Sequence, residues 1–489
     1  MKKILQFTAI LFFVFSINAA AQTVTAKVID AQNQPVPYVS IQIGPTYGVM
    51  SNEEGIFVIT VPEKPEDNKI IFSSIGYETL TIPLADLKAG TYVLKEQVNV
   101  LDEVFITNKK YTPIEILTKV KENAPQNYAS QTAKQTFFLR NSHDNKLIDS
   151  KFEMIKSSLE KKSTLKDLNK ELEEIAKKKK GQRSTDFSEA YGFLYTQNGE
   201  SKLVVEKAVE LKNKEKDVAG DQNSKLIEVI KKHLEPDATY KVRSGILPVD
   251  DSLKVSSPAK DVKEDVKTAS LRSSITALSE KLNKFYTNEE LDFLTEFKRY
   301  TYALEGFATF NGETIYIIDF KPAKGSAHYY GKLYVNAADF ALVKLDYNLV
   351  DGEYERKVNL KLVLGLKMIQ DGTKVSATFA KNEAGQYAVN FVKKQMRNYM
   401  YINRSLKFTK NKVSKDEETR MLKIEFLMEV DVFATNELFI IDRKPATAAE
   451  FAGITEKANY NVNYISKFDP AIWKDYNVLA PVEAIKNYQ

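Results

Sequence analysis

Three histidines, His143, His233 and His328, are the side chains best suited to bind a metal ion or move a proton in this 489-residue chain. A hydrolytic zinc site needs a histidine and a glutamate closely spaced, with a second histidine to complete the ligands. His143 is followed by DNKL, His233 is followed by LEPD, and His328 has no acidic neighbour. The spacing therefore indicates neither a zinc carboxypeptidase site nor a catalytic histidine.

The sequence also lacks the other common catalytic motifs. It has no G-x-S-x-G nucleophile turn, no phosphate-binding Gly-Lys-Ser/Thr loop and no His-Glu-x-x-His. Paired carboxylates for glycoside hydrolysis stay open as an alternative, since nothing singles out a pair among the 65 acidic residues. We therefore assign no catalytic, cofactor-binding or metal-ligating residue, expect no cofactor, and leave the ligand-binding residues unassigned.

Several side chains have both a binding and a structural interpretation. Asp30, Asn33, Asn52, Glu53 and Glu54 could bind Ca²⁺, but they lack the spacing of a calcium loop, and Asp and Asn commonly stabilise turns. We favour the turn interpretation.

Two further stretches, one rich in lysine and one in tyrosine, and a single tryptophan can also be interpreted as either binding or structural features. Residues 177–181, KKKKG, could bind an acidic lipid or polysaccharide, but a helix end favoured by the helix dipole explains them more simply. His328, Tyr329 and Tyr330 could line a pocket, although a packed strand face accounts for them as well. The only tryptophan, Trp473, is expected to hold the C-terminal tail against the rest of the protein.

Residues 1–21 predict export. Lys2 and Lys3 precede an apolar run from Ile4 to Ile17, and three alanines then supply a cleavage site. An anchor helix needs about 20 apolar residues, so we expect a cleaved signal peptide. The chain has no cysteine, which excludes disulfides, thiol catalysis and a lipid-modified cysteine. The net charge of +5 is too mild to indicate nucleic acid as a partner.

Residues 22–107 predict an all-β sandwich, because short alternating runs are separated by turn residues. Gly76, in FSSIGYET, would form a corner that needs a backbone angle closed to other residues. Four stretches, VIDAQNQPVPYVSIQI, GVMSNEEGIFVITVP, IIFSSIGYETLTI and LDEVFIT, resemble in that order the carboxypeptidase-regulatory-like domain. The resemblance implies a transthyretin-like β-sandwich and an exported protein of the Bacteroidetes type, where this domain also precedes outer-membrane receptors.

Residues 108–300 predict a helical and charged-loop segment, partly disordered. Apolar side chains recur at helical spacing in 164–181 and again in 271–285. A further helix is expected over 288–300, capped by Thr287 and Glu290. The charged stretches 205–225 and 250–268 predict solvated loops.

Residues 301–489 predict an antiparallel β meander with a C-terminal tail. Asn311-Gly312 is a strong hairpin signal, and the strands alternate between apolar and polar residues. IYIIDFKPA, YYGKLYVNAADFALVKLDYNL and FDPAIWKDYN resemble the uncharacterised region that follows the regulatory-like domain in related exported proteins. That resemblance implies an open half-barrel like that of lipoprotein carriers. Because regular aromatic girdles are missing, we favour a soluble curved sheet over an integral outer-membrane barrel.

The expected fold class is therefore mainly β with a helical segment, and the leading hypothesis is a non-enzymatic binding or scaffold protein of the periplasm or outer membrane. The sandwich would dock on a partner, and the half-barrel would bind a lipid, another apolar ligand or an envelope protein. The alternative is an envelope enzyme that acts on surface polysaccharide or peptide through an unrecognised site. The helices of 271–298 would cover only part of the meander's apolar face, leaving a cleft. That face comprises Val343, Leu345, Tyr347, Val358, Leu360, Leu362, Ile424, Phe426 and Met428.

The first prediction concerns processing. We expect the mature protein to begin at Gln22, because Ala19, Ala20 and Ala21 supply the small residues that signal peptidase accepts. N-terminal sequencing and intact mass of the exported protein measure this. A mature chain that still carries Lys2 would instead indicate an uncleaved anchor.

Overall fold

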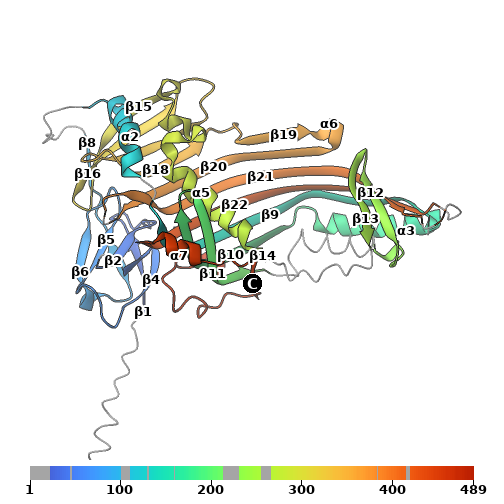
Figure 1. The fold of residues 1–489 in the computed structure, drawn as a ribbon, viewed down its shortest axis with the longest axis horizontal. Helices are drawn as coiled ribbons and strands as arrows, with labels where there is room; N and C mark the ends of the chain where they lie inside the picture. Colours follow the sequence, from blue (N-terminus) through green and yellow to red (C-terminus); the bar gives the residue numbers. More distant parts are fainter. Residues whose placement is uncertain are drawn as a thin grey trace, which may run out of the picture. The chain divides into compact units, whose positions relative to one another are not determined.

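The computed structural model forms two compact units. The first contains the described residues up to Asn99 together with Ala308–Glu313 and Asp469–Lys486, and the second contains the remainder (Figure 1). The expected signal peptide lies outside the described residues. The structure describes residues 23–44, 47–100, 111–128, 131–158, 160–212, 231–254, 266–382, 384–412, 414 and 419–488.

The first unit is a β-sandwich, as predicted. One sheet has the order β4-β1-β7 and the other the order β3-β2-β5-β6. Alternate side chains of each strand point inward, and Ile41, Phe57 and Phe72 are fully buried between the sheets. The elements are β1 (Thr23–Ile29), β2 (Ser40–Ile43), β3 (Tyr47–Met50), β4 (Ile56–Thr60), β5 (Lys69–Ser73), β6 (Leu80–Pro83), η1 (Leu84–Asp86) and β7 (Thr91–Val93). β8 (Val98–Val100) follows in the chain and belongs to the large sheet.

Gly76 lies at the corner that the sequence predicts. Its φ of 92° belongs to the left-handed region, and its carbonyl accepts a hydrogen bond from the Gln97 amide at 2.8 Å. A residue with a Cβ rarely adopts such an angle. Glycine at this position therefore allows the backbone to turn.

The C-terminal tail packs within the same unit as the sandwich. Leu479 and Ile485 are buried, and the Asn52 side chain donates to the carbonyl oxygens of Ala480 and Pro481 at 3.4 and 3.3 Å. Trp473 is only partly buried and packs against Tyr476, with ring centroids 5.5 Å apart. Small and aliphatic side chains around Leu479 supply the most buried contact of the tail, and the expectation that Trp473 holds the tail stays a prediction.

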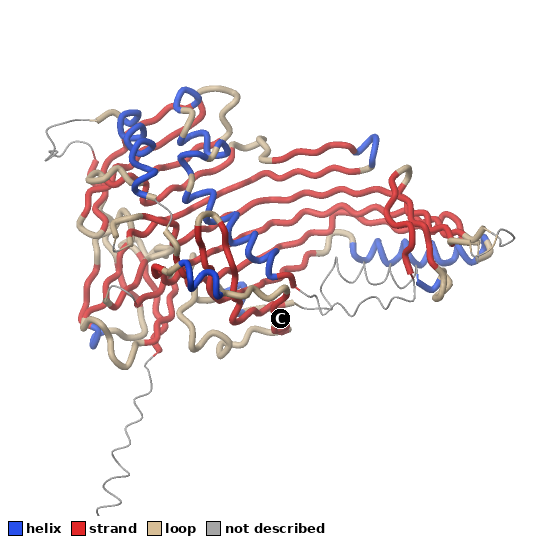
Figure 2. The backbone as a smooth tube through the Cα atoms, in the orientation of Figure 1, coloured by secondary structure: helices blue, strands red, loops and turns tan. Residues whose placement is uncertain are grey.

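A large curved sheet dominates the second unit, as expected, and Figure 2 shows how far its longest strands extend. Its main path has the order β24-β11-β10-β9-β22-β21-β20-β18-β17-β16-β15. The strands are β9 (Ala133–Ser157), β10 (Arg183–Gln197), β11 (Glu200–Leu211), β12 (Thr239–Ser244), β13 (Leu247–Lys254), β14 (Val266–Lys267), β15 (Tyr300–Phe310), β16 (Glu313–Pro322), β17 (Tyr329–Asn336), β18 (Leu342–Leu349), β19 (Arg356–Leu360), β20 (Leu366–Lys381), β21 (Tyr387–Lys410), β22 (Met421–Pro445), β23 (Asn459–Tyr460) and β24 (Asn463–Ile465).

The helices of this unit lie against the sheet or between its strands. In α2 the side chain of Thr112 caps the first turn and Pro113 occupies its first position. Helix α3 packs on β9, and α5 crosses toward β21, where the Asn283 side chain accepts a hydrogen bond from the Val389 amide at 2.8 Å. The helices are α2 (Pro113–Asn127), α3 (Lys162–Lys179), α5 (Thr268–Asn283), η2 (Phe285–Thr287), η3 (Glu289–Leu294), η4 (Phe297–Arg299), α6 (Lys361–Leu364) and α7 (Ala448–Gly453), and α8 (Glu483–Lys486) belongs to the tail.

The expected helical character of 108–300 is wrong for much of that segment. Strands β9, β10 and β11 lie within it and join the curved sheet, so part of the predicted loop at 205–225 is a strand. Their polar residues alternate with apolar ones and form the solvated face, which makes them look like loop sequence. The predicted helix over 288–300 is two short 3-10 turns, and Asn288, not Thr287, caps the first.

The second prediction tests the corner at Gly76. Replacing Gly76 with valine in the full chain should lower the free energy of unfolding by about 1–3 kcal/mol, because a branched side chain resists a positive φ. Gly325→Val is the matched control, since a Cβ at Gly325 meets no atom within 4 Å and its φ is not positive. Thermal and urea unfolding measure both variants. Equal stabilities would show that the backbone angle at Gly76 does not constrain the sandwich.

Candidate binding surface

Four strands of the second unit align their apolar side chains in two rows across the sheet. Residues directly opposite in antiparallel strands point to the same face. One row runs through Leu360, Leu366, Ile402 and Met428 of β19, β20, β21 and β22 in turn, and the next runs through Val358, Met368, Met400 and Val430. We call these eight residues the open apolar face.

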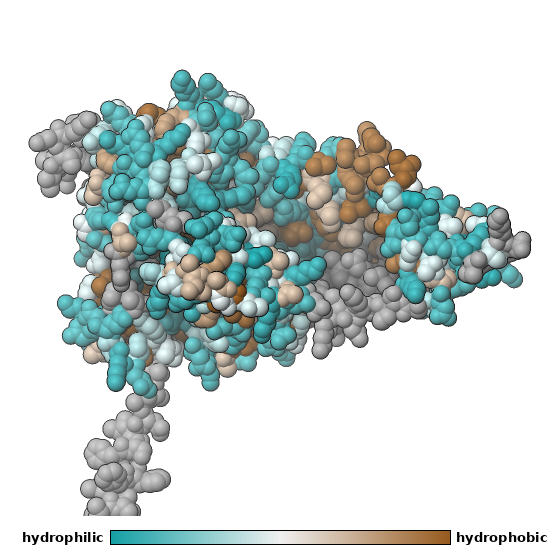
Figure 3. Space-filling view, viewed as in Figure 1, coloured by the Kyte–Doolittle hydropathy of each residue, from teal (hydrophilic) through white to brown (hydrophobic). Residues whose placement is uncertain are grey.

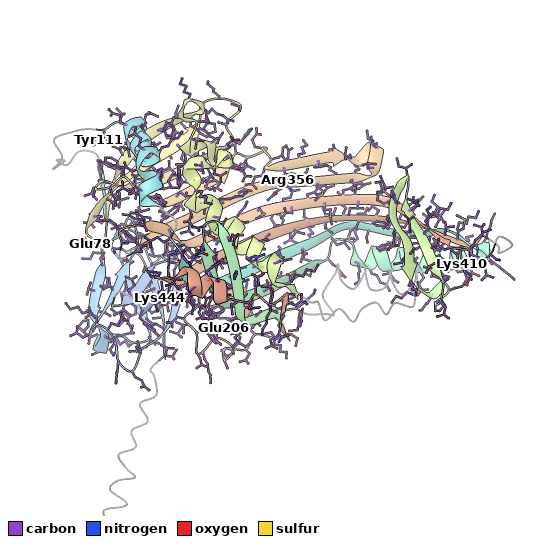
Figure 4. All side chains as sticks on the ribbon, in the orientation of Figure 1. Glu78, Tyr111, Glu206, Arg356, Lys410 and Lys444 are labelled. Carbon is purple, nitrogen blue, oxygen red and sulfur yellow. The ribbon has the colours of Figure 1, made fainter. Side chains whose placement is uncertain are left out.

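The open apolar face is most exposed on its two outer strands, β19 and β20. Met368 is 51% exposed and Leu360 41%, whereas Val430 is only 8% exposed. The hydrophobic side chains at this end of the sheet gather visibly over β19 and α6 in Figure 3. The neighbouring row, Arg356, Gln370 and Asn398, is polar and bounds the face on one side. Figure 4 shows Arg356 on β19.

The other end of the same sheet face is covered. Phe293 of η3 packs against Tyr347 of β18, with ring centroids 5.1 Å apart, and Leu345 is fully buried. Burial raises the pKa of Tyr347 well above its ordinary value, so this hydroxyl stays protonated at physiological pH. The segment after α5 thus covers Val343, Leu345 and Tyr347 but not Val358, Leu360 and Leu362, which agrees with the expected uncovered end.

The opposite face of the long strands is polar and hydrogen-bonded. Arg397 donates to Asp431 at 2.8 Å and pairs with Asp371 at 3.2 Å. The Tyr399 hydroxyl donates to Glu429, and burial together with this hydrogen bond raises its pKa. Because charged and hydrogen-bonded side chains interrupt the apolar residues on this opposite face, the two aligned apolar rows are a feature of one side of the sheet.

Arg404 joins two chain turns at the far end of the open apolar face. Its Nε and Nη2 donate to the side chain and carbonyl of Ser244, and its Nη1 donates to the Leu364 carbonyl at 2.7 Å. Gly365 ends α6 with a φ of 64°, and an added Cβ would lie 1.9 Å from the Asn403 carbonyl oxygen. Only glycine therefore fits where the α6 turn meets β21.

The three histidines each lie near one carboxylate. His143 is 3.0 Å from Asp186, and His328 is 3.0 Å from Glu353. His233 is 3.3 Å from Glu160. Among the described residues, no group of three or more His, Asp or Glu side chains could hold a metal ion.

The sequence-predicted turn residues act as expected. The Asp30 carboxylate accepts from the amides of Gln32 and Gln34, and the Asn52 oxygen accepts from those of Glu54 and Ile56, all within 2.9 Å. Lysines 177–179 form the last turn of α3.

The tyrosines beside His328 belong to strand β17. Tyr329 packs against Tyr347, with ring centroids 5.4 Å apart, and Tyr330 is 42% exposed. Most residues that line a cavity of about 150 Å³ near Tyr347 carry polar or charged side chains, among them Asp346, Lys374 and Lys393. Neither group resembles an apolar binding site.

Sequence reasoning named part of the open apolar face but missed its neighbours. Met368, Met400 and Ile402 were not singled out, because their strands carry many polar residues and their alignment depends on register. The run VNLKLVLGLKM, residues 358–368, was the available signal, since it combines six aliphatic side chains with lysines and one glycine.

The comparisons with known proteins concern the first unit. Residues 24–106 match the family model of the CarboxypepD_reg-like domain, so this part of the chain is a carboxypeptidase-regulatory-like β-sandwich. Such domains occur in exported proteins. No curated protein matches the chain. Among the described residues, no helix is both long and apolar enough to cross a membrane.

The third prediction tests Arg404. Arg404→Leu removes hydrogen bonds to both turns, and charge-assisted bonds of this kind contribute about 1.5–3 kcal/mol each. We expect faster amide exchange at residues 244–247 and 361–365. Hydrogen-exchange mass spectrometry measures it, with the exposed Lys407→Leu on the same strand as control. Unchanged protection would show that other contacts hold these turns.

Proposed function

We propose that the protein is a non-enzymatic, exported binding protein of the periplasm or outer membrane, and that the open apolar face binds the alkyl chain of a lipid. The observation that supports this proposal is the alignment of eight apolar side chains in two rows, partly exposed on one side of a folded sheet. Exposed contiguous apolar patches on otherwise polar proteins commonly mark binding sites.

The shape of the face suits a chain rather than a compact ligand. Neighbouring strands lie about 4.8 Å apart, so the four strands span roughly 14 Å from β19 to β22. Both rows run in that direction, and the residues of the two outer strands, β19 and β20, include the most exposed ones, whereas Val430 of β22 is buried. An alkyl chain lying across the strands would contact both rows along its length.

Methionine makes the face adaptable. Met368 and Met400 are directly paired, and Met428 lies on the next strand. Unbranched, polarizable methionine side chains adjust to apolar ligands of different shape. Arg356, exposed at the same edge, could pair with a negatively charged headgroup.

The sandwich would dock on an envelope protein partner, and the second unit would carry the ligand. A partner protein that adds a strand along β19 is the other occupant we consider, because β19 is a short strand whose one partner among the described strands is β20. The ligand experiment below separates the two.

An enzyme is the second candidate function, and one observation favours it. His143 of β9 lies 3.0 Å from Asp186, whose carboxylate would orient the imidazole ring. Ala434 of β22 is directly opposite His143, and Val432 lies two residues away on the same strand. In the described part of the chain, however, no hydroxyl nucleophile is hydrogen-bonded to His143. Hydrolysis assays with lipid, peptide and polysaccharide substrates on wild type and His143→Ala decide this candidate.

The fourth prediction tests the open apolar face. Met368→Glu and Leu360→Glu should weaken binding of a fluorescent fatty acid by about tenfold or more, because each places a carboxylate against an alkyl chain. Both positions are more than a third exposed, so the fold should survive. Phe433→Glu is the matched control, since Phe433 is 49% exposed on the polar face opposite Arg397.

Mass spectrometry of an organic extract of protein purified from its native envelope provides a second measurement. We expect a lipid to co-purify with the wild type and to be lost in Met368→Glu. An empty extract and equal fatty-acid binding by all three variants would overturn the proposal. Crosslinking of β19 to another protein in intact cells would then support the partner interpretation.

A further inference from the structure

The apolar side chains with the highest exposed fractions in the described part of the second unit lie on two adjacent turns. Leu362 and Val363 of α6 are 101% and 81% exposed, and Ile246, in the turn between β12 and β13, is 89% exposed. Leu247 and Val249 of the same hairpin are 42% and 59% exposed. We call these five residues the apolar tip.

The two turns of the apolar tip are fixed to one another. Arg404 hydrogen-bonds Ser244, which directly precedes the β12–β13 turn, and Leu364, the last residue of α6. β12 also pairs with β21, so the hairpin is part of the sheet. Folding thus holds these side chains in water at defined positions, where their exposure contributes nothing to stability.

Lysines and tyrosines lie directly behind the tip. The Lys361 ammonium sits 4.0 Å from the ring centroid of Tyr401, and Lys367 sits 5.2 Å from that of Tyr399. Lysines beside an exposed apolar end are typical of a membrane interface, where snorkelling ammonium groups meet lipid headgroups.

The hairpin also carries two acidic residues, and these are engaged locally. Asp251 pairs with Arg243 at 3.4 Å and with Lys241 at 3.9 Å. Asp250 accepts a hydrogen bond from the Ser252 amide. Lys241, Arg243, Lys361 and Lys367 outnumber Asp250 and Asp251, so the charge around the tip is net positive and complements an anionic surface.

We propose that the apolar tip inserts into one leaflet of an anionic lipid bilayer, with Lys361 and Lys367 against its headgroups. A bilayer fits better than a protein groove, because the tip combines exposed apolar side chains from two separate turns with flanking cations. The inference goes beyond the binding of an alkyl chain. It places the α6 end of the open apolar face at the membrane surface, since Leu366 follows the tip directly along the chain.

Vesicle flotation of the full mature chain tests the proposal. We expect wild type to float with phosphatidylcholine vesicles that contain phosphatidylglycerol, and to float less with phosphatidylcholine alone. The double variant Leu362→Glu/Val363→Glu should bind the anionic vesicles about tenfold more weakly or worse. Both positions are almost fully exposed, so unfolding does not explain a loss, and Phe433→Glu should bind like wild type. Lys361→Glu/Lys367→Glu should lose only the part of binding that high salt also removes.

The outcome is distinguishable from that of the alkyl-chain proposal. Met368→Glu should still float with anionic vesicles while losing fatty-acid binding, and the tip variant should show the reverse. Flotation of the tip variant equal to wild type would overturn the membrane inference. Failure of wild type to bind either vesicle would overturn it too, as would a concentration-dependent dimer that only the tip variant abolishes, because the tip would then be an interface between two copies.

Discussion

The register of the long strands depends on one buried ion pair network in the second unit. Arg140 of β9 lies directly opposite Glu189 of β10 and Glu437 of β22, 2.7 and 3.7 Å from their carboxylates, and all three side chains are at least 93% buried. Shifting a strand by one residue would move its apolar side chains to the other face. It would also separate a buried arginine from its carboxylates, and breaking such a pair typically costs about 3–5 kcal/mol. The network therefore favours a single alignment of β9, β10 and β22.

That alignment creates more apolar surface than the described helices cover. β9, β21 and β22 are 25, 24 and 25 residues long, well beyond an ordinary strand. Their apolar side chains continue along one face from the region under α5 and η3 to the turn at α6. The 3-10 turns of 285–299 bury Tyr347 and Leu345, and α3 with the β12 strand buries Ile424 and Phe408. Between these covered regions, the paired methionines and leucines remain partly exposed, so the proposed binding surface follows from strand length.

The first unit combines the sandwich with segments from far along the chain. Its sandwich is small, its core consists of alternating inward side chains, and the chain's own tail belongs to the same compact unit. Asn52 links the two parts, since its oxygen stabilises the turn before β4 while its amide group reaches the carbonyl oxygens of the tail. A fragment that ends near residue 107 therefore lacks a segment that the compact unit contains, and that segment lies more than 360 residues further along the chain.

Local sequence patterns alone determine many secondary-structure features of this protein. The sandwich strands, the positive φ at Gly76, the Asn311-Gly312 turn and the apolar stripes of α3 and α5 depend on neighbouring residues, so the sequence predicts them correctly. It also indicated part of the exposed apolar face, through Val358, Leu360 and Leu362. Tertiary structure decided that β9 is a strand, because β22, far along the chain, supplies hydrogen-bonding partners along its length. By contrast, β10 and β11 form a local hairpin through Asn198-Gly199, a turn signal in the sequence that sequence reasoning missed. Tertiary structure likewise decided which apolar residues align into rows and that Arg404 brings two distant turns together. Register and long-range pairing are properties of the folded sheet, and no local stretch of sequence contains them.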